Sequence, residues 1–408
     1  MKGLLCGLLI VRFYNNCKKE KVEDKYSMDC KQKSILVIKG INQYGVLSYM
    51  LEGIAAELQY RGYIVTVCNW DELDEWKKQK WDICISCQAI EMTFDVQADQ
   101  YVTWLVDHPV LLNERLIMYK DMENLWIGCV DQTHVAYLKQ CMDFKHAFFM
   151  PHFAGQAAKM KEYMDREIEV FFPASYMDVK EFENEHSDWR NGAVKIVSDQ
   201  AIDFLKNHNE VSVEQAVKIV LKQMGELVDK GFLKECMDGF GGYIDTYICR
   251  FYRQQIVTGL LDEGVFLTVV GNGWNDFKEK YQGNGKIDIL SENMSYEEVL
   301  NCMADSKMVL NVLPWFKDGS HERVTSALMN GAVCLSDQNE YTKRYLEDEA
   351  SAILYDRTDP KGLAKKIRHY LKHQDEAANI AKNGRNIAMG NMTVEKAVDI
   401  LLQAMEEE

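Results

Sequence analysis

Residues able to hold a phosphate group are concentrated in one polar segment that follows an apolar run. The apolar run 310–313 ends at Pro314, and the spacing predicts a helix that begins near His321, capped by Ser320. The start of such a helix presents free backbone N–H groups and the positive end of its dipole, a combination that binds phosphate. The segment therefore predicts an anion site at the end of a strand.

Two cationic side chains flank that predicted helix start. Arg323 carries a fork of N–H donors suited to a diphosphate, and Lys317 adds a point charge. An ordinary surface helix, with Arg323 paired to a carboxylate, is the alternative interpretation. Gly331 is placed to end the helix after Asn330.

A glycine turn offers a second place where backbone could approach a ligand. Gly271, Asn272 and Gly273 follow the apolar run 265–270. An ordinary tight turn explains them equally well, since the third glycine of a dinucleotide-binding turn is missing.

Polar residues also follow apolar runs in the first half of the chain. Asp107 and His108 could accept a proton from a bound hydroxyl or orient a ligand, or they could form a polar turn stabilised by Pro109. Further histidines at strand or turn ends, and a loop after the first predicted strand, are candidates for the same ligand cleft, on the side that the resemblance described below implies for the acceptor. These residues are Gly40, Tyr44, Gly45, His134 and His152.

Short apolar strands alternate with helical periods, which predicts parallel sheets covered on both faces. The first alternation, 33–155, gives six strands and one doubly wound domain. The second, 156–375, gives another, with a helical insertion at about 178–264. The tail 376–408 is helical and long enough to cross back onto the first domain. Ligands bind between two such domains at the carboxyl ends of their strands.

Composition restricts the partners. The chain has 408 residues and a net charge of −16, which opposes binding to nucleic acid and allows at most weak membrane association. Its twelve cysteines are scattered, with several in apolar runs, as in a reduced cytoplasmic protein. Residues 1–32 are expected to form a loosely ordered leader, too short in its apolar part to span a bilayer.

The polar segment carries a family resemblance. The run 317–337 resembles the sugar-nucleotide segment of CgeB-like glycosyltransferases of the GT-B fold (glycosyl transferases group 1 type). The runs 101–109, 131–134, 306–312 and 380–384 also look like that family, and the likeness covers about 33–400. One departure is Ser326, which stands where many members carry a glutamate that would hold the ribose hydroxyls.

The resemblance implies two Rossmann-like domains facing a cleft and a hexosyltransferase. It would move a sugar from a nucleotide-diphosphate sugar to an unidentified glycan, protein or small-molecule hydroxyl. It also implies catalysis without a metal or cofactor, with retained stereochemistry. The implied donor-binding residues are Gly271, Asn272, Gly273, Lys317, Gly319, Ser320, His321, Glu322, Arg323 and Ser326. Ser326 motivates an alternative, a catalytically silent protein of this fold that binds a nucleotide or sugar as a regulatory or scaffold module.

Overall fold

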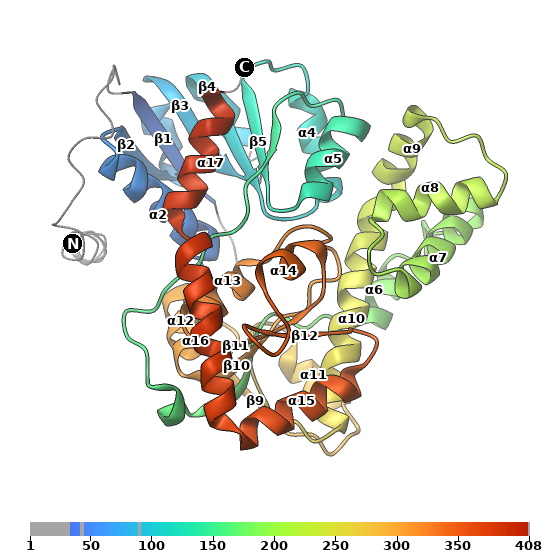
Figure 1. Cartoon of the computed structure of the whole chain (residues 1–408). Helices are drawn as coiled ribbons and strands as arrows, with labels where there is room; N and C mark the ends of the chain where they lie inside the picture. The colour runs from blue at the N-terminus through green and yellow to red at the C-terminus, as the bar shows by residue number, and fades with distance from the viewer. Residues whose placement is uncertain (1–32, 41–44, 89–90, 407–408) are drawn as a thin grey trace.

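The computed structural model describes residues 33–40, 45–88 and 91–406. Two parallel six-stranded sheets organise the chain (Figure 1). The predicted leader 1–32 and Tyr44 lie outside the described residues.

The first sheet has the order β2-β1-β3-β4-β5-β6. Its strands are β1 (Ser34–Lys39), β2 (Ile64–Asn69), β3 (Lys80–Cys87), β4 (Gln97–Leu105), β5 (Leu125–Cys129) and β6 (Ala147–Phe149). The main helices around it are α2 (Val46–Tyr60), α3 (Leu73–Trp76), α4 (Asn113–Leu116) and α5 (Gln132–Cys141).

The second sheet has the order β12-β11-β10-β7-β8-β9. Its strands are β7 (Ile168–Pro173), β8 (Leu267–Val270), β9 (Ile287–Ser291), β10 (Ser306–Leu310), β11 (Val333–Asp337) and β12 (Ile353–Tyr355). Its helices are α11 (Trp274–Lys280), α12 (Tyr296–Ala304), α13 (Glu322–Met329), α14 (Glu340–Tyr345), α15 (Pro360–Lys372) and α16 (Gln374–Asn391). The strand order reverses between β7 and β10, the point where open parallel sheets bind ligands.

Both sheets are covered on their two faces, which explains their apolar strands. In β1, Ile35 and Val37 pack with α2, whereas Leu36 and Ile38 belong to a separate core on the opposite face. All five residues of β11 are buried. A strand buried on both sides must be apolar at nearly every position, and this pattern made the strands visible in the sequence. The predicted fold of two doubly wound α/β units is confirmed.

Helices fill the connection between β7 and β8. They are α6 (Val179–Glu185), α7 (Gly192–Asn207), α8 (Val213–Gln223), α9 (Lys230–Cys236) and α10 (Gly242–Asp262). Figure 1 shows this insertion, in green and yellow, standing beside α5 at one end of the first sheet.

The last helix, α17 (Val394–Glu406), returns to the first sheet and packs beside α2 (Figure 1). Arg61 pairs with Asp399 at 2.7 Å, and the indole N–H of Trp126 donates to the carbonyl of Ala404 at 3.1 Å. None of the described helices is long and apolar enough to cross a membrane.

Candidate functional site

The carboxyl ends of the two sheets meet through backbone contacts. Asp131, directly after β5, forms an antiparallel bridge with Gly319, which lies between β10 and α13. The N–H of Gln132 donates to the carbonyl of Asp318 at 3.0 Å. His152, which follows β6, donates from Nδ1 to the carbonyl of Ser320 at 2.7 Å. The strand ends that bind ligands in such folds therefore face one another across this seam.

Helix α13 begins at Glu322, and His321 caps it with extended backbone. The Nδ1 atom of His321 accepts from the N–H of Arg323 at 3.3 Å. The prediction that Ser320 is the cap is wrong, because the chain turns from extended to helical one residue later; the Ser320 hydroxyl donates instead to the His321 carbonyl at 3.2 Å. The predicted stop is confirmed, since Gly331 follows the helix with a φ of +66°.

Arg323 lies at the point where the strand order of the second sheet reverses. Its Nε donates to the carbonyl of Pro173, at the end of β7, at 2.8 Å. One Nη donates to Oδ1 of Asn311, directly after β10, at 3.1 Å. The side chain is only 5 % exposed, so the interpretation as an ordinary surface arginine is wrong.

The residue Asn311 was not singled out from the sequence. Its own Nδ2 donates to Ser336 Oγ, and its carbonyl accepts from the Tyr355 hydroxyl at 2.6 Å. A polar residue inside the apolar run 308–313 was the signal that could have identified it. Asn311 thus connects Arg323 to the ends of three strands, which fixes the guanidinium at the seam.

Four predicted residues gather around the start of α13. His152 and His321 have ring centroids 5.8 Å apart, and the Glu322 carboxylate contacts His321 Nδ1. Burial disfavours charge on Glu322, but His321 and Arg323 outweigh it and lower the Glu322 pKa to about 2. Asp107, after β4, is close enough to His321 for the two to affect each other's pKa.

Asp107 combines solvent access with a crowded environment. Its side chain is exposed, yet burial by the surrounding protein raises its pKa, against the effects of His321 and of a hydrogen bond from Gln88. Burial and His321 lower the pKa of His152 to about 4. Since a carbonyl only accepts, the Nδ1 atom of His152 carries the proton that it donates to Ser320. His152 is therefore neutral near pH 7.

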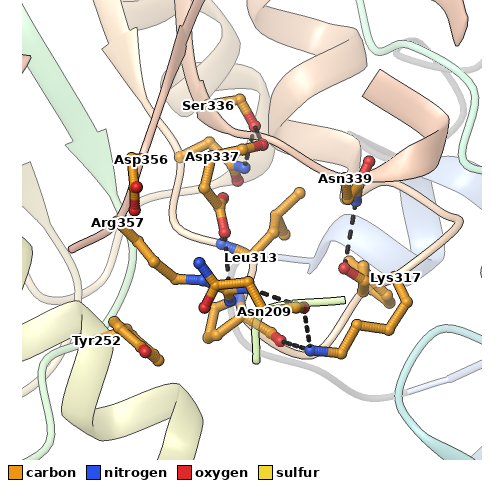
Figure 2. A network of polar contacts seen from close by, with 12 residues as sticks. Asn209, Tyr252, Leu313, Lys317, Ser336, Asp337, Asn339, Asp356 and Arg357 are labelled. Carbon is orange, nitrogen blue, oxygen red and sulfur yellow. Dashed lines mark hydrogen bonds and ion pairs between the residues drawn. The ribbon is translucent and has the colours of Figure 1, made fainter. Parts of the chain in front are cut away.

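Lys317 points into protein rather than toward a ligand (Figure 2). Its Nζ donates to the carbonyls of Asn209, at 2.8 Å, and Pro314, at 2.9 Å. Arg357 donates to the same Asn209 carbonyl at 3.0 Å and lies 3.5 Å from Asp337. Burial and the charge of Arg357 lower the pKa of Lys317 to about 7. The Lys317 ammonium does not face the start of α13. Its position therefore differs from the predicted one beside a phosphate.

Ser326 and Gly319 serve packing. The Ser326 hydroxyl accepts from the N–H of Gly155 at 2.9 Å and shares a hydrogen bond with Tyr296. A Cβ at Gly319 would lie 2.2 Å from the carbonyl oxygen of Val130, so glycine is needed for the two backbones to approach. Both residues join segments of the seam.

His108 and His134 do not join the group at α13. His108 accepts at Nδ1 from the N–H of Val110, and its Nε2 lies 3.7 Å from Glu214 of the helical insertion. Burial opposes protonation of His108, but Glu214 raises its pKa overall. His134 is fully buried, with its ring centroid 4.5 Å from that of His108. These two histidines contact the insertion side of the first domain.

The predicted glycine residues lie at strand ends with packing roles. Gly273 has a φ of +83°, and its backbone meets the Tyr176 carbonyl so closely that a Cβ would lie 2.3 Å away. Gly271 and the exposed Asn272 complete this turn after β8. Gly40 accepts a hydrogen bond from Ser48 at 3.2 Å, and Gly45, with φ of +72°, precedes α2.

Two surface hollows lie far from these residues, at the amino-terminal ends of the strands. One is lined by residues around β8 and β9, including Phe266, Tyr281 and Lys286, and the other by residues around β5 and β6. Among the residues that the structure describes, no group of three or more His, Cys, Asp or Glu side chains is placed to hold a metal ion. Catalysis without a metal stays a prediction.

Two parallel sheets that meet at their carboxyl ends, with a crossing last helix, define a GT-B-like fold. Residues 253–403 match a family model described as glycosyl transferase-like. No curated protein matches the chain.

Solved structures of glycosyltransferases share the whole architecture. Sucrose-phosphate synthase from Thermosynechococcus elongatus aligns with a TM-score of 0.55 and 10% identity, covering 92% of this chain and 99% of that one. An alpha-glucosyltransferase in complex with UDP and DNA aligns with a TM-score of 0.54 and 10% identity, covering 92% and 100%. Anabaena HepE in complex with UDP-glucose gives 0.50 and 12%, covering 92% and 98%. At these identities the likeness shows the fold, which confirms the predicted architecture.

Proposed function

We propose that this protein is a glycosyltransferase of the CgeB-like type that moves a hexose from a nucleotide-diphosphate sugar to an acceptor hydroxyl. The match of 253–403 to the glycosyl transferase-like family supports this, as do the GT-B-like neighbours, two of which bind UDP or UDP-glucose. The donor is proposed to bind between the start of α13 and the end of β7.

The observation that carries the proposal is the position of Arg323. Its guanidinium is held by Pro173 and Asn311 at the point where the strand order reverses, beside the N–H groups at the start of α13. A fixed cation beside the positive end of a helix dipole stabilises the charge that develops on a departing diphosphate. This mechanism needs no metal, and we propose retained stereochemistry.

Asp107 and His152 lie across the seam from that helix start and are proposed to contact the sugar. His152 holds its Nδ1 proton toward Ser320 and stays neutral, so it adds no positive charge of its own near neutral pH. The exposed carboxylate of Asp107 is available to orient a sugar hydroxyl or to accept its proton.

The catalytically silent alternative keeps one specific observation in its favour. The Ser326 hydroxyl is hydrogen-bonded to the backbone N–H of Gly155 and to the buried hydroxyl of Tyr296. A ribose therefore receives no carboxylate from this position. Under this alternative the protein binds a nucleotide or sugar nucleotide without turning it over.

The test measures donor binding and turnover separately. UDP affinity is measured by calorimetry, and sugar release or transfer from UDP-glucose and other sugar nucleotides is followed by mass spectrometry. Arg323→Lys keeps the charge but loses the planar fork, and we expect it to weaken UDP binding about 10–100-fold, the value of a lost charged hydrogen bond or two. Arg115→Lys, on the exposed surface of α4, is the matched control.

Equal UDP affinity in Arg323→Lys and the unchanged protein would refute the assignment of the diphosphate to Arg323. Tight binding of several sugar nucleotides with no turnover, across glycan, protein and small-molecule acceptors, would favour the silent alternative. Circular dichroism of each variant separates these results from loss of folding.

A further inference from the structure

A group of buried polar side chains joins the first domain to the helical insertion. We call it the His134 cluster, and it consists of His108, His134, Glu214 and Asp245. Both ring nitrogens of His134 are buried without a hydrogen-bond partner, as is Oδ1 of Asp245. His134 and Asp245 are 0 % and 4 % exposed. His108 Nε2 and one Glu214 carboxylate oxygen are likewise buried without a partner, so these residues carry five such atoms. Buried polar atoms are nearly always hydrogen-bonded, so these five indicate a partner from outside the chain.

The unpartnered atoms of the cluster form no hydrogen bond with one another, although His108 and Glu214 are close enough for an ion pair. His108 Nε2 lies 3.7 Å from the nearer Glu214 oxygen, beyond hydrogen-bond distance. The Asp245 carboxyl is near enough to His108 and Asp107 for their charges to affect its pKa, which burial raises to about 6. Asp107 is exposed at the seam, so this electrostatic effect links the cluster to the proposed sugar site.

The charges around the cluster oppose strongly charged ligands. Glu214 and Asp245 would repel an anion, and Lys317, whose charge affects the pKa values of His134 and Asp245, would repel a cation when it is protonated. The unpartnered atoms include an acceptor, Asp245 Oδ1, and the His134 ring, which in its neutral form has one donor and one acceptor. A hydroxyl group both donates and accepts, so a neutral polyhydroxyl compound satisfies this mixture.

We propose that the His134 cluster binds the hydroxyl groups of a small neutral sugar or polyol, which is the acceptor of the transfer. The identification of this ligand as the acceptor rests on the proposed function. The existence of the binding site is argued from the buried, unpartnered atoms alone. The helical insertion then supplies one wall of the acceptor site through Glu214 and Asp245, and the first domain supplies the other through His108 and His134. Because these side chains are almost fully buried, the inference concerns a small acceptor and not a macromolecule.

His134→Phe is a clean variant for the test. The His134 ring makes no hydrogen bond within the protein and packs against the rings of His108 and Phe316, so phenylalanine preserves its packing. We expect its melting temperature to equal or exceed that of the unchanged protein. His146→Phe, whose ring stacks on Trp126 at a distant edge of the first domain, is the matched control.

The experiment titrates the full chain, saturated with UDP, with glucose, myo-inositol, glucose 6-phosphate and glucosamine. Saturation-transfer NMR reports each affinity. We expect glucose or myo-inositol to bind, the charged sugars to bind more weakly, and His134→Phe to weaken the neutral ligands at least tenfold while His146→Phe leaves them unchanged.

Three results would overturn the inference: neither neutral ligand binds, so that water alone satisfies the buried atoms; a charged sugar binds more tightly than its neutral counterpart; or His134→Phe binds the neutral ligands as well as the unchanged protein does. Calorimetry with UDP is run on the same samples without sugar. If the unchanged protein does not bind UDP, the proposed transferase function is contradicted. The neutral-sugar titration, repeated without UDP, still tests whether the His134 cluster binds a neutral ligand.

Discussion

The carboxylate of Asp131 in the first domain accepts a hydrogen bond from the backbone N–H of Lys317 in the second, at 2.7 Å. The same oxygen accepts from the N–H of Asp318 at 2.8 Å, and the other oxygen accepts from the N–H and hydroxyl of Thr133. Asp131 is fully buried. One first-domain side chain thus holds the loop that leads into α13, and with it the position of Arg323.

Asp131→Asn tests this connection. The amide keeps the shape of the carboxylate but turns one NH₂ group toward N–H donors, which leaves buried donors without acceptors. Each costs about 1–3 kcal/mol, so we expect a loss of about 2–4 kcal/mol, or about 2–5 °C in melting temperature by calorimetry for a chain of this length. Asp74→Asn, on an exposed ion pair with Lys77, should change stability by less than about 0.5 kcal/mol. An Asp131→Asn protein as stable as that control would show that the connection contributes little.

Gly319→Ala tests the close approach of the two domains. An added Cβ would lie 2.2 Å from the Val130 carbonyl oxygen and 2.7 Å from the Asp131 Cα, so the loop must move away from the first domain. We expect lower UDP affinity and a larger radius of gyration by small-angle X-ray scattering. Gly239→Ala is the control, because nothing lies within 4 Å of its added Cβ and its φ is not positive. Unchanged scattering and affinity in Gly319→Ala would argue against a seam fixed by this contact.

The sequence predicted the sheets well for a physical reason. Strands buried on both faces are apolar throughout, and the twelve predicted apolar runs coincide with β1–β12 to within a few residues. The stop of α13 at Gly331 was also visible, because a left-handed residue favours glycine.

The site was only partly predictable, because sequence shows where a strand ends but not which way a side chain then points. Arg323 and His152 reach the seam, but Lys317 turns inward to Asn209, a residue 108 positions away. His108 turns toward Glu214, whose place in the insertion no local pattern reveals. Pairings between distant elements decided these orientations, and a single sequence carries no signal for them.

Stability should rise with pH above neutrality because of Lys317. Its pKa is about 7 when folded and near 10.5 when unfolded, so between these values the unfolded chain binds more protons than the folded one. Unfolding therefore becomes less favourable as pH rises from about 7 toward 10. Melting temperatures of the unchanged protein and Lys317→Met, measured from pH 6.5 to 9, should diverge, with the unchanged protein gaining relative to the variant. A constant difference across that range would show that Lys317 keeps an ordinary pKa.

His152 should have an effect of the same sign as Lys317 on stability, but in the acidic range. Its folded pKa is about 4 and its unfolded value near 6.5, so the unfolded chain binds more protons between these values and stability falls as pH drops from about 6.5 to 4. In His152→Asn the amide can still donate to the Ser320 carbonyl but does not titrate. We expect the variant to be less stable than the unchanged protein at pH 7 and to lose less stability on acidification to pH 4.5. His146→Asn controls for removing a histidine outside the seam. Parallel acid profiles for the unchanged protein and His152→Asn would mean that His152 is protonated in the folded protein as readily as in the unfolded chain.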